Sequence, residues 1–371
     1  MLEHITIGLM SGTSLDGTDA VAVRFSSSGM QRLGHAYAPF PSSLRHELAA
    51  LTLPGEQEIE RMGDASVQLV KHYAETVDHL LAKTGLHSSD IAAIGVHGQT
   101  IRHRPERHFS VQLNYPALLA ELTDIDVIAD FRSRDIAAGG EGAPLVPAFH
   151  AECFTGDIPR VILNLGGIAN ISILPPKARQ NSITGILGGD TGPANMLLDT
   201  WSLKSRALPY DKDGLWSSTG KISSALLASC LEEPYFARPF PKSTGRELFS
   251  PEWLDKKITA FSNLPAEDIA RTLTELTAVT VTDAVRQLAP DTEEMILCGG
   301  GSFNHTLVTA LKSHFNGQIF TTEHFGINPM EVEAAAFAWL ASRFLQRLPG
   351  NLPAVTHAAG PRILGALYPA G

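Results

Sequence analysis

The chain has 371 residues, 44% of them hydrophobic and 18% charged, so it can form two or three domains and is too apolar for wholesale disorder. Its formal net charge of −10 favours neither nucleic acid nor an anionic membrane, and we expect neither partner. Its three cysteines are widely spaced, and no apolar run approaches the about 18 residues of a membrane span. Without a basic leader, we expect a cytoplasmic protein.

The first part of the chain alternates short strands and helices. Residues 5–7 and 20–23 flank a turn-rich loop at 11–17, which predicts a hairpin. Apolar residues at helical spacing predict a helix over 56–83, and residues 91–96 predict a buried strand. Pro116 suits the first position of a helix reaching Leu122. A short strand at 126–129 precedes a glycine-rich stretch at 139–142, where we place the first domain boundary.

The second part opens in the same way. Residues 161–163 and 171–173 flank a glycine-bearing turn at 164–170, again predicting a hairpin. Helices are expected over 268–288, after Asn304 and over 331–344, with a strand at 295–298. The repeated hairpin favours a two-lobed α/β protein with a cleft between the lobes, although two short hairpins can also be alike by coincidence.

The loop at 11–17 combines glycine, hydroxyl and carboxylate groups. Gly12 and Gly17 make backbone N–H groups accessible, and Asp16 adds a carboxylate. This set suits a phosphate with its metal ion, although a hairpin tip of this composition is more often a plain turn. It matches neither a Walker A motif nor a G-x-G-x-x-G turn.

Asp190 is surrounded by glycines at 188, 189 and 192, and Pro193 is placed to open a helix. A carboxylate here can accept a proton from an attacking hydroxyl or water, beside helix amides that favour an anion. The alternative is that Asp190 or Thr191 is a helix N-cap.

A third glycine cluster, residues 299–301, follows the strand predicted at 295–298. Three glycines allow a ligand to approach the backbone closely, and ligands of open α/β sheets gather at strand carboxyl ends. One such cluster alone would be a tight turn, but three at strand ends favour a nucleotide site.

Polar residues follow two further predicted strands. Gln99 and Thr100 could hydrogen-bond a sugar, and Arg132 could hold a carboxylate in a bidentate pair, although end-of-strand loops are the simpler interpretation. The histidines at 97, 103 and 108 match no common zinc spacing. Residues 242–247 form either a mobile lid or a solvated loop. Glu331 and Glu333 start a helix after Pro329, where acidic residues suit the helix dipole.

These motifs, in this order, are the basis of a family resemblance. The chain resembles the anhydro-N-acetylmuramic acid kinases of the sugar kinase, Hsp70 and actin superfamily, nearly from end to end. The resemblance rests on residues 8–17, 97–100, 190–195, 242–247, 298–301 and 328–329 with 333–334.

The resemblance implies an α/β fold of two ribonuclease-H-like lobes, as in actin-like ATPases, with ATP in the cleft between them, and a homodimer. We expect an N-terminal lobe at 1–138, which residues 345–371 rejoin, and a C-terminal lobe at 139–344.

The implied reaction is phosphorylation of O6 of 1,6-anhydro-N-acetylmuramate by ATP while water opens the anhydro ring, giving N-acetylmuramate 6-phosphate and ADP in peptidoglycan recycling. Asp190 takes the position of the general base, Glu333 that of a second acid near the sugar, and Asp16 that of a Mg²⁺ ligand. The expected sugar contacts are His97, Gln99, Thr100 and Arg132. The expected ATP contacts are Gly12, Thr13, Ser14, Leu15, Asp16, Gly17, Thr18, Asp19, Gly299, Gly300 and Gly301.

The sequence departs from the usual family pattern at Gly189, where an aromatic residue is common, and at Ala194, where glycine is common. The first departure puts the pose of Asp190 in question. The alternatives for function are another sugar kinase or a phosphohydrolase of the superfamily, a non-catalytic sugar or nucleotide sensor, and an actin-like filament. Replacing the acceptor sugar distinguishes the other sugar kinase and the phosphohydrolase from the expected activity. The presence of Asp16, Asp190 and Glu333 argues against the sensor.

Overall fold

The computed structural model describes residues 3–12, 14–27, 29–177 and 185–371. The chain forms two compact units. Unit 1 contains residues 1–153 and 331–371, and unit 2 contains residues 154–330. Among the helices of the described ranges, none is both long and apolar enough to cross a membrane.

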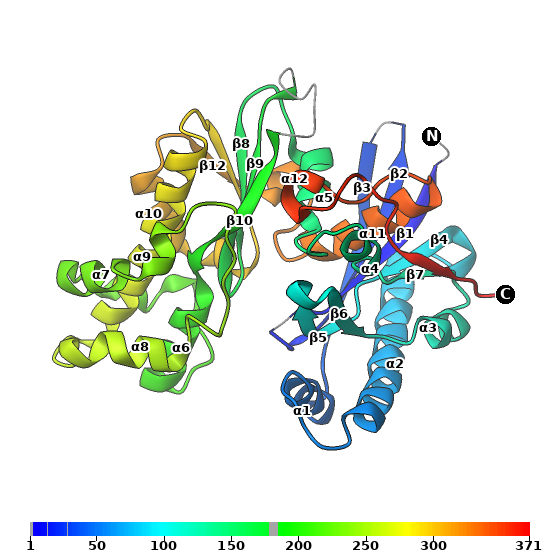
Figure 1. Cartoon of the computed structure of the whole chain (residues 1–371), viewed down its shortest axis with the longest axis horizontal. Coiled ribbons are helices and arrows are strands. Elements are labelled where there is room, and N and C mark those ends of the chain that lie inside the picture. Colours follow the sequence, from blue (N-terminus) through cyan, green and yellow to red (C-terminus); the bar gives the residue numbers. More distant parts are fainter. Residues whose placement is uncertain (1–2, 13, 28, 178–184) are drawn as a thin grey trace. The chain divides into compact units, whose positions relative to one another are not determined.

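Unit 1 is built on a six-stranded sheet in the order β13-β7-β4-β1-β2-β3 (Figure 1). β1 to β3 run antiparallel to one another, while β4 and β7 continue the sheet in parallel from β1. The strands are β1 (His4–Met10), β2 (Gly17–Ser26), β3 (Gly29–Pro39), β4 (Ile91–Val96), β7 (Val127–Ala129) and β13 (Ala366–Tyr368). β5 (Gln99–Arg104) and β6 (Phe109–Leu113) form a separate antiparallel pair.

Helices cover both faces of this sheet. Ile7 and Leu9 belong to a core shared with α2, whereas Thr6, on the opposite face, donates its hydroxyl to the Ala338 carbonyl of α11 at 2.8 Å. The helices of unit 1 are α1 (Ser42–Leu51), α2 (Glu58–Thr84), α3 (Pro116–Thr123), α4 (Ser133–Ala137), α5 (Val146–Phe154), α11 (Val332–Leu345) and α12 (Pro353–Thr356).

α11 lies directly on the backbone of β1 and β4. A Cβ atom at Gly8 would lie 1.8 Å from the Ala334 carbonyl oxygen, and one at Gly95 would lie 2.1 Å from the Phe337 carbonyl oxygen. Only glycine leaves room for a helix at this distance from the sheet. The alanines of α11 complete the close packing, since all of them are buried.

Unit 2 has a five-stranded sheet in the order β10-β9-β8-β11-β12 (Figure 1). Its strands are β8 (Arg160–Leu165), β9 (Ile168–Leu174), β10 (Leu187–Pro193), β11 (Glu294–Cys298) and β12 (Gln318–Thr321). Its helices are α6 (Asn195–Arg206), α7 (Ser224–Leu231), α8 (Pro251–Ile258), α9 (Ala266–Leu288) and α10 (His305–His314). α9 contributes residues to both hydrophobic clusters of the unit.

The two sheets share one topology. In each, the first three strands form an antiparallel meander, and the fourth and fifth continue in parallel beside the first. This confirms the predicted α/β fold of two ribonuclease-H-like lobes, and it gives the repeated hairpin a structural basis.

The unit boundaries differ from those predicted. Residues 139–153 and 331–344 belong to unit 1, whereas we expected them in the C-terminal lobe. The physical reason is packing: Phe149 of α5 contacts Trp339 of α11 with ring centroids 6.1 Å apart, and α11 itself is buried on the unit 1 sheet. Near the end of the chain, β13 pairs with β7 of the unit 1 sheet.

Candidate functional site

The loop between β1 and β2 is a compact turn with an exposed carboxylate. The Leu15 amide donates to the Gly12 carbonyl at 3.2 Å, and Leu15 has a left-handed φ of 56°. Ser14 donates its hydroxyl to Asp16 at 2.7 Å. Asp16 is therefore held at the surface of the turn, with oxygen atoms of the kind that Mg²⁺ prefers. Thr13 lies outside the described residues.

Gly12 and Gly17 are glycines for different reasons. A Cβ at Gly17 would lie 2.4 Å from the Ala38 carbonyl oxygen of β3, so the fold itself excludes a side chain there. A Cβ at Gly12 would meet only the Ser14 Oγ, at 3.7 Å. The protein therefore leaves open space beside the backbone at Gly12.

Two buried side chains hold this loop in place through hydrogen bonds. The Gln99 side chain, 1% exposed, donates to the Gly12 carbonyl at 3.2 Å, and Ser11 shares a 2.7 Å hydrogen bond with Tyr73 of α2. Gln99 thus contacts the phosphate-loop candidate, whereas we expected it at the sugar. Thr100 lies beside it and accepts from Gln112 at 3.2 Å. Thr18 is buried in β2, and its hydroxyl has no partner among the described residues.

Arg132 and His97 form a pair in unit 1. Arg132 donates to the His97 Nε2 from its Nη2 at 2.7 Å and from its Nε at 3.3 Å. Burial and the Arg132 charge lower the pKa of His97 well below its usual range, so the ring is neutral and accepts at Nε2. Burial also lowers the pKa of Arg132 to about 10, which leaves it charged at neutral pH. Arg132 is therefore a positive charge that is held in a fixed position.

Glu333 is electrostatically coupled to this cation and to the loop. Burial raises the pKa of Glu333, the Arg132 charge lowers it, and Asp19 and Asp16 raise it again. Glu333 is therefore influenced by the charge of Arg132 and by the carboxylates of Asp16 and Asp19. Within the described ranges, no cluster of three metal-ligating side chains is arranged to hold an ion without further ligands.

Asp19 belongs to a network that the sequence analysis missed. His35 of β3 contacts Asp19 through Nε2 at 2.8 Å, and its Nδ1 lies 3.4 Å from Glu331. Glu331 in turn accepts two hydrogen bonds from Arg32. Burial raises the pKa of Asp19, and His35 opposes that shift. Side chains alternate between the two faces of a strand, so Arg32 and His35 would lie on opposite faces of a regular β3. The shift of register in the pairing of β2 with β3 brings them to the same face, and a sequence pattern does not reveal such a shift.

Asp190 lies in unit 2, within β10 and before α6 as predicted, but Pro193, which we expected to open the helix, is the last residue of the strand. Its Oδ1 accepts from Asn170 at 2.8 Å, and its Oδ2 accepts from the Thr244 amide at 3.0 Å. Asn170 is its register partner on β9. Burial raises the pKa of Asp190, the two hydrogen bonds lower it, and Glu247 raises it. The carboxylate is therefore oriented by two donors and is more basic than an exposed one.

The space beside Asp190 is filled although residue 189 is glycine. A Cβ at Gly189 would lie 3.0 Å from the Phe240 ring and from the Lys242 carbonyl oxygen, which itself accepts from the Asp190 amide at 2.9 Å. Lys242 is anchored by the Phe236 carbonyl at 2.9 Å. Lys242 and Thr244 thus pack against Asp190, and the Phe240 ring lies where a side chain at residue 189 would be.

Gly299 to Gly301 follow β11 and pack on the second hairpin. A Cβ at Gly299 would lie 2.4 Å from the Asn164 side chain, and one at Gly301 would lie 2.7 Å from the Leu165 Cβ. At Gly300 a Cβ would meet only the Met330 sulfur, at 3.8 Å. Two of the three glycines are therefore required by the fold, and Gly300 presents open backbone.

The backbone amides at the start of α6 already donate hydrogen bonds within the protein. Those of Ala194, Asn195 and Met196 donate to the Gly166 and Gly167 carbonyls at 3.0–3.1 Å. The predicted anion site at this helix start is therefore wrong. The same contacts fix the tip of the β8-β9 hairpin, which is the counterpart in unit 2 of the loop at 11–17.

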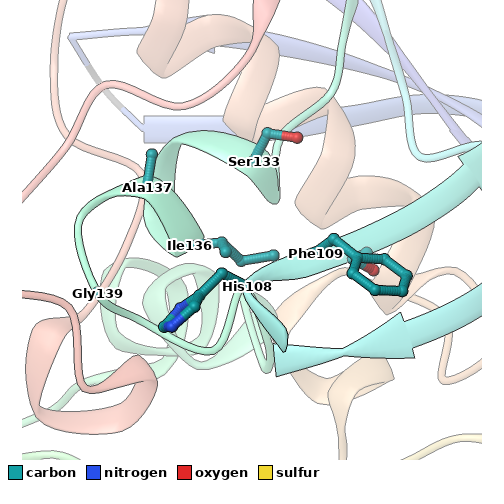
Figure 2. Close-up of a pocket in the computed structure, with 7 residues that line it drawn as sticks. His108, Phe109, Ser133, Ile136, Ala137 and Gly139 are labelled. Atoms are coloured by element: carbon teal, nitrogen blue, oxygen red, sulfur yellow. The ribbon is translucent and has the colours of Figure 1, made fainter. Parts of the chain in front are cut away.

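A pocket of about 410 Å³ opens on unit 1 between β6 and α4 (Figure 2). It is lined by His108, Phe109, Ser110, Ser133, Ile136, Ala137 and Gly139. None of the predicted site residues lines it, so the candidate site is built from the residues described above.

Comparison with known proteins places the chain in a family. The model of the anhydro-N-acetylmuramic acid kinase family matches residues 4–370. The chain belongs to this family. The family match spans both units, and it includes Asp190, Glu333, Arg132 and the loop at 11–17.

Curated members of the family resemble the chain over its full length. The anhydro-N-acetylmuramic acid kinase of Burkholderia cenocepacia is 52% identical, covering 99% of this chain and 97% of its own length. That of Burkholderia thailandensis is 49% identical, covering 99% and 98%. Among solved structures, the activator of the 2-hydroxyisocaproyl-CoA dehydratase from Clostridium difficile aligns over 92% of this chain and 97% of its own, with 15% identity and a TM-score of 0.49.

Proposed function

We propose that this protein is an ATP-dependent kinase that phosphorylates O6 of 1,6-anhydro-N-acetylmuramate and opens the anhydro ring with water, as a step of peptidoglycan recycling. The observation that carries the proposal is 52% identity to a named anhydro-N-acetylmuramic acid kinase over 99% of the chain. The doubled topology and the oriented carboxylate of Asp190 support it.

The chemistry couples one hydrolysis to one phosphoryl transfer. Water attacks C1 of the sugar and gives its proton to Asp190, the C1–O6 bond breaks, and O6 attacks the γ-phosphorus of ATP. The bond between that phosphorus and the bridging oxygen breaks, and ADP leaves. Asp190 must be ionised to act as the base, and the donors Asn170 and Thr244 hold both of its oxygens in place.

The ATP phosphates would pass the open backbone at Gly12. Asp16, with Asp19 nearby, has the oxygen donors that Mg²⁺ takes from proteins when phosphates complete its shell. Mg²⁺ would neutralise the charge that develops on the phosphoryl oxygens. Gln99 and Ser11 hold the loop that carries these groups.

The sugar's carboxylate would pair with Arg132. The guanidinium has five N–H groups, of which three donate hydrogen bonds: two to His97 and one to Gly142. The other two, one on each terminal nitrogen, have no acceptor among the described residues, and we propose that they form the fork that binds the carboxylate. Glu333, coupled to Arg132, would face the sugar as the second acid. We further propose a cytoplasmic homodimer.

Replacing Gly12 by alanine tests the phosphate loop. The new methyl group has room in the protein itself, so we expect an unchanged melting temperature. It would occupy the approach of the phosphates, and we expect the KM for ATP to rise at least about tenfold, the equivalent of about 1.4 kcal/mol of lost binding. Steady-state kinetics and calorimetric ATP titration measure this. An unchanged KM would remove Gly12 from the site.

Replacing Asn170 by alanine tests the base through its pH profile. Asn170 stabilises the ionised form of Asp190, so its loss raises the pKa of Asp190 further. Because only the ionised base works, the acidic limb of kcat/KM moves to higher pH, while activity above that limb is largely retained. A uniform loss at all pH values would instead indicate a purely structural Asn170.

Acceptor swaps test the function itself. With Mg²⁺-ATP, the wild-type protein should release ADP only with the anhydro sugar, and the product mass should include one phosphoryl group and one water. Activity on an ordinary hexose in place of the anhydro sugar would support another sugar kinase, and ADP release without any sugar would support a phosphohydrolase.

A further inference from the structure

The C-terminal segment, residues 346–371, returns from α11 along unit 1 to the sheet edge (Figure 1). β13 pairs with β7, and the Ala370 amide donates to Asp126 at 3.0 Å. Between α11 and β13 the segment carries two buried polar side chains, Asn351 and Thr356, which are 5% and 0% exposed. Buried polar groups need hydrogen-bond partners, and both of these side chains donate to the same residue.

That partner is Asp135 of α4, which is fully buried. Its Oδ1 accepts from the Asn351 side chain at 2.6 Å and from the Thr356 hydroxyl at 2.7 Å. Its Oδ2 accepts from the Gly142 amide at 2.8 Å. The Glu141 amide also donates to the Thr356 carbonyl at 2.7 Å. The C-terminal segment and Asp135 together fix the backbone at 141–142.

This backbone is itself a partner of Arg132. The Gly142 carbonyl accepts from the Arg132 Nη1 at 2.7 Å, and His97 accepts on the opposite side of the guanidinium. Gly142 and His97 thus fix the plane of the fork. The Asp135 carboxylate holds the Gly142 amide, and two of the three hydrogen bonds that this carboxylate accepts come from the C-terminal segment.

We propose that Asn351 and Thr356 are positioning residues for substrate recognition, acting through Asp135 and Gly142 to aim the free fork of Arg132 at the carboxylate of the sugar. This rests on the proposed function, in which Arg132 binds that carboxylate. The C-terminal segment then sets specificity for an acidic sugar, although its residues are remote from the reacting atoms.

The test compares equilibrium binding of two sugars by calorimetry on the full chain. One is 1,6-anhydro-N-acetylmuramate, and the other is 1,6-anhydro-N-acetylglucosamine, which lacks the lactyl carboxylate. The variants are Thr356→Val, which loses the hydroxyl at nearly constant shape, Thr356→Ser, which keeps it, and Arg132→Gln. If Thr356→Val does not fold, Thr356→Ala removes the hydroxyl without crowding.

We expect the wild type to prefer the acidic sugar and Arg132→Gln to lose the preference. In Thr356→Val the preference should fall by about tenfold, as for a misaligned charge-assisted hydrogen bond, with binding of the neutral sugar unchanged and Thr356→Ser close to wild type. Equal effects on both sugars, or none, would overturn the positioning role while the proposed function stands. No preference in the wild type would remove the role of Arg132, and the inference with it.

Discussion

Replacing Asp190 by asparagine is expected to lower kcat by about three orders of magnitude, within the range for loss of a general base. The amide has nearly the shape of the carboxylate but cannot take the proton of the attacking water. The asparagine oxygen can still accept from one of the two donors, Asn170 or the Thr244 amide, and the pairing of β10 with β9 is unchanged, so the fold of β10 should be retained. The measurement is single-turnover kinetics with saturating ATP and anhydro sugar.

The matched control is Asp283→Asn on α9, where an exposed carboxylate pairs with Arg286 on the helix surface. This variant should retain wild-type activity. ATP affinity should be unchanged in both variants, because neither residue is proposed to touch the nucleotide. An Asp190→Asn protein with more than about a tenth of wild-type kcat would exclude Asp190 as the base.

Replacing Gly8 by alanine is expected to destabilise unit 1 by at least about 3 kcal/mol, the upper range for overpacking a core. The new Cβ would lie 1.8 Å from the Ala334 carbonyl oxygen and 2.5 Å from the Ala338 nitrogen, both of which are backbone atoms of α11. The helix would have to move off β1. Urea unfolding monitored by circular dichroism should show a much lower midpoint.

Gly63→Ala provides the contrast. Gly63 lies in α2, and a Cβ there would meet nothing within 4 Å, so the substitution should stabilise the helix by about 0.5–1 kcal/mol. If Gly8→Ala unfolds at the wild-type midpoint, α11 does not pack on β1 as described.

Elements with strong periodicity could be predicted from the sequence. The helix predicted over 56–83 is α2 (Glu58–Thr84), and the strand predicted over 91–96 is β4. β10 could not be predicted, because its residues Gly188, Gly189 and Gly192 have low strand propensity. Pairing with β9 and a bulge near Thr191 hold it as a strand.

The candidate site could be predicted in its motifs but not in its supporting contacts. Asp190 and Arg132 stand out in the sequence because glycines or a strand end surround them. Their partners do not: Thr244 is 54 residues from Asp190, and Thr356 is 221 residues from Asp135. Such contacts arise from tertiary packing, which a local pattern does not encode.

The most direct test of the proposed activity is the mass of the product formed from Mg²⁺-ATP and 1,6-anhydro-N-acetylmuramate in ¹⁸O-labelled water. We expect N-acetylmuramate 6-phosphate with one ¹⁸O at C1 and an equal amount of ADP. A phosphorylated sugar that keeps its anhydro ring, or ring opening without ADP, would contradict the coupling of hydrolysis to phosphoryl transfer.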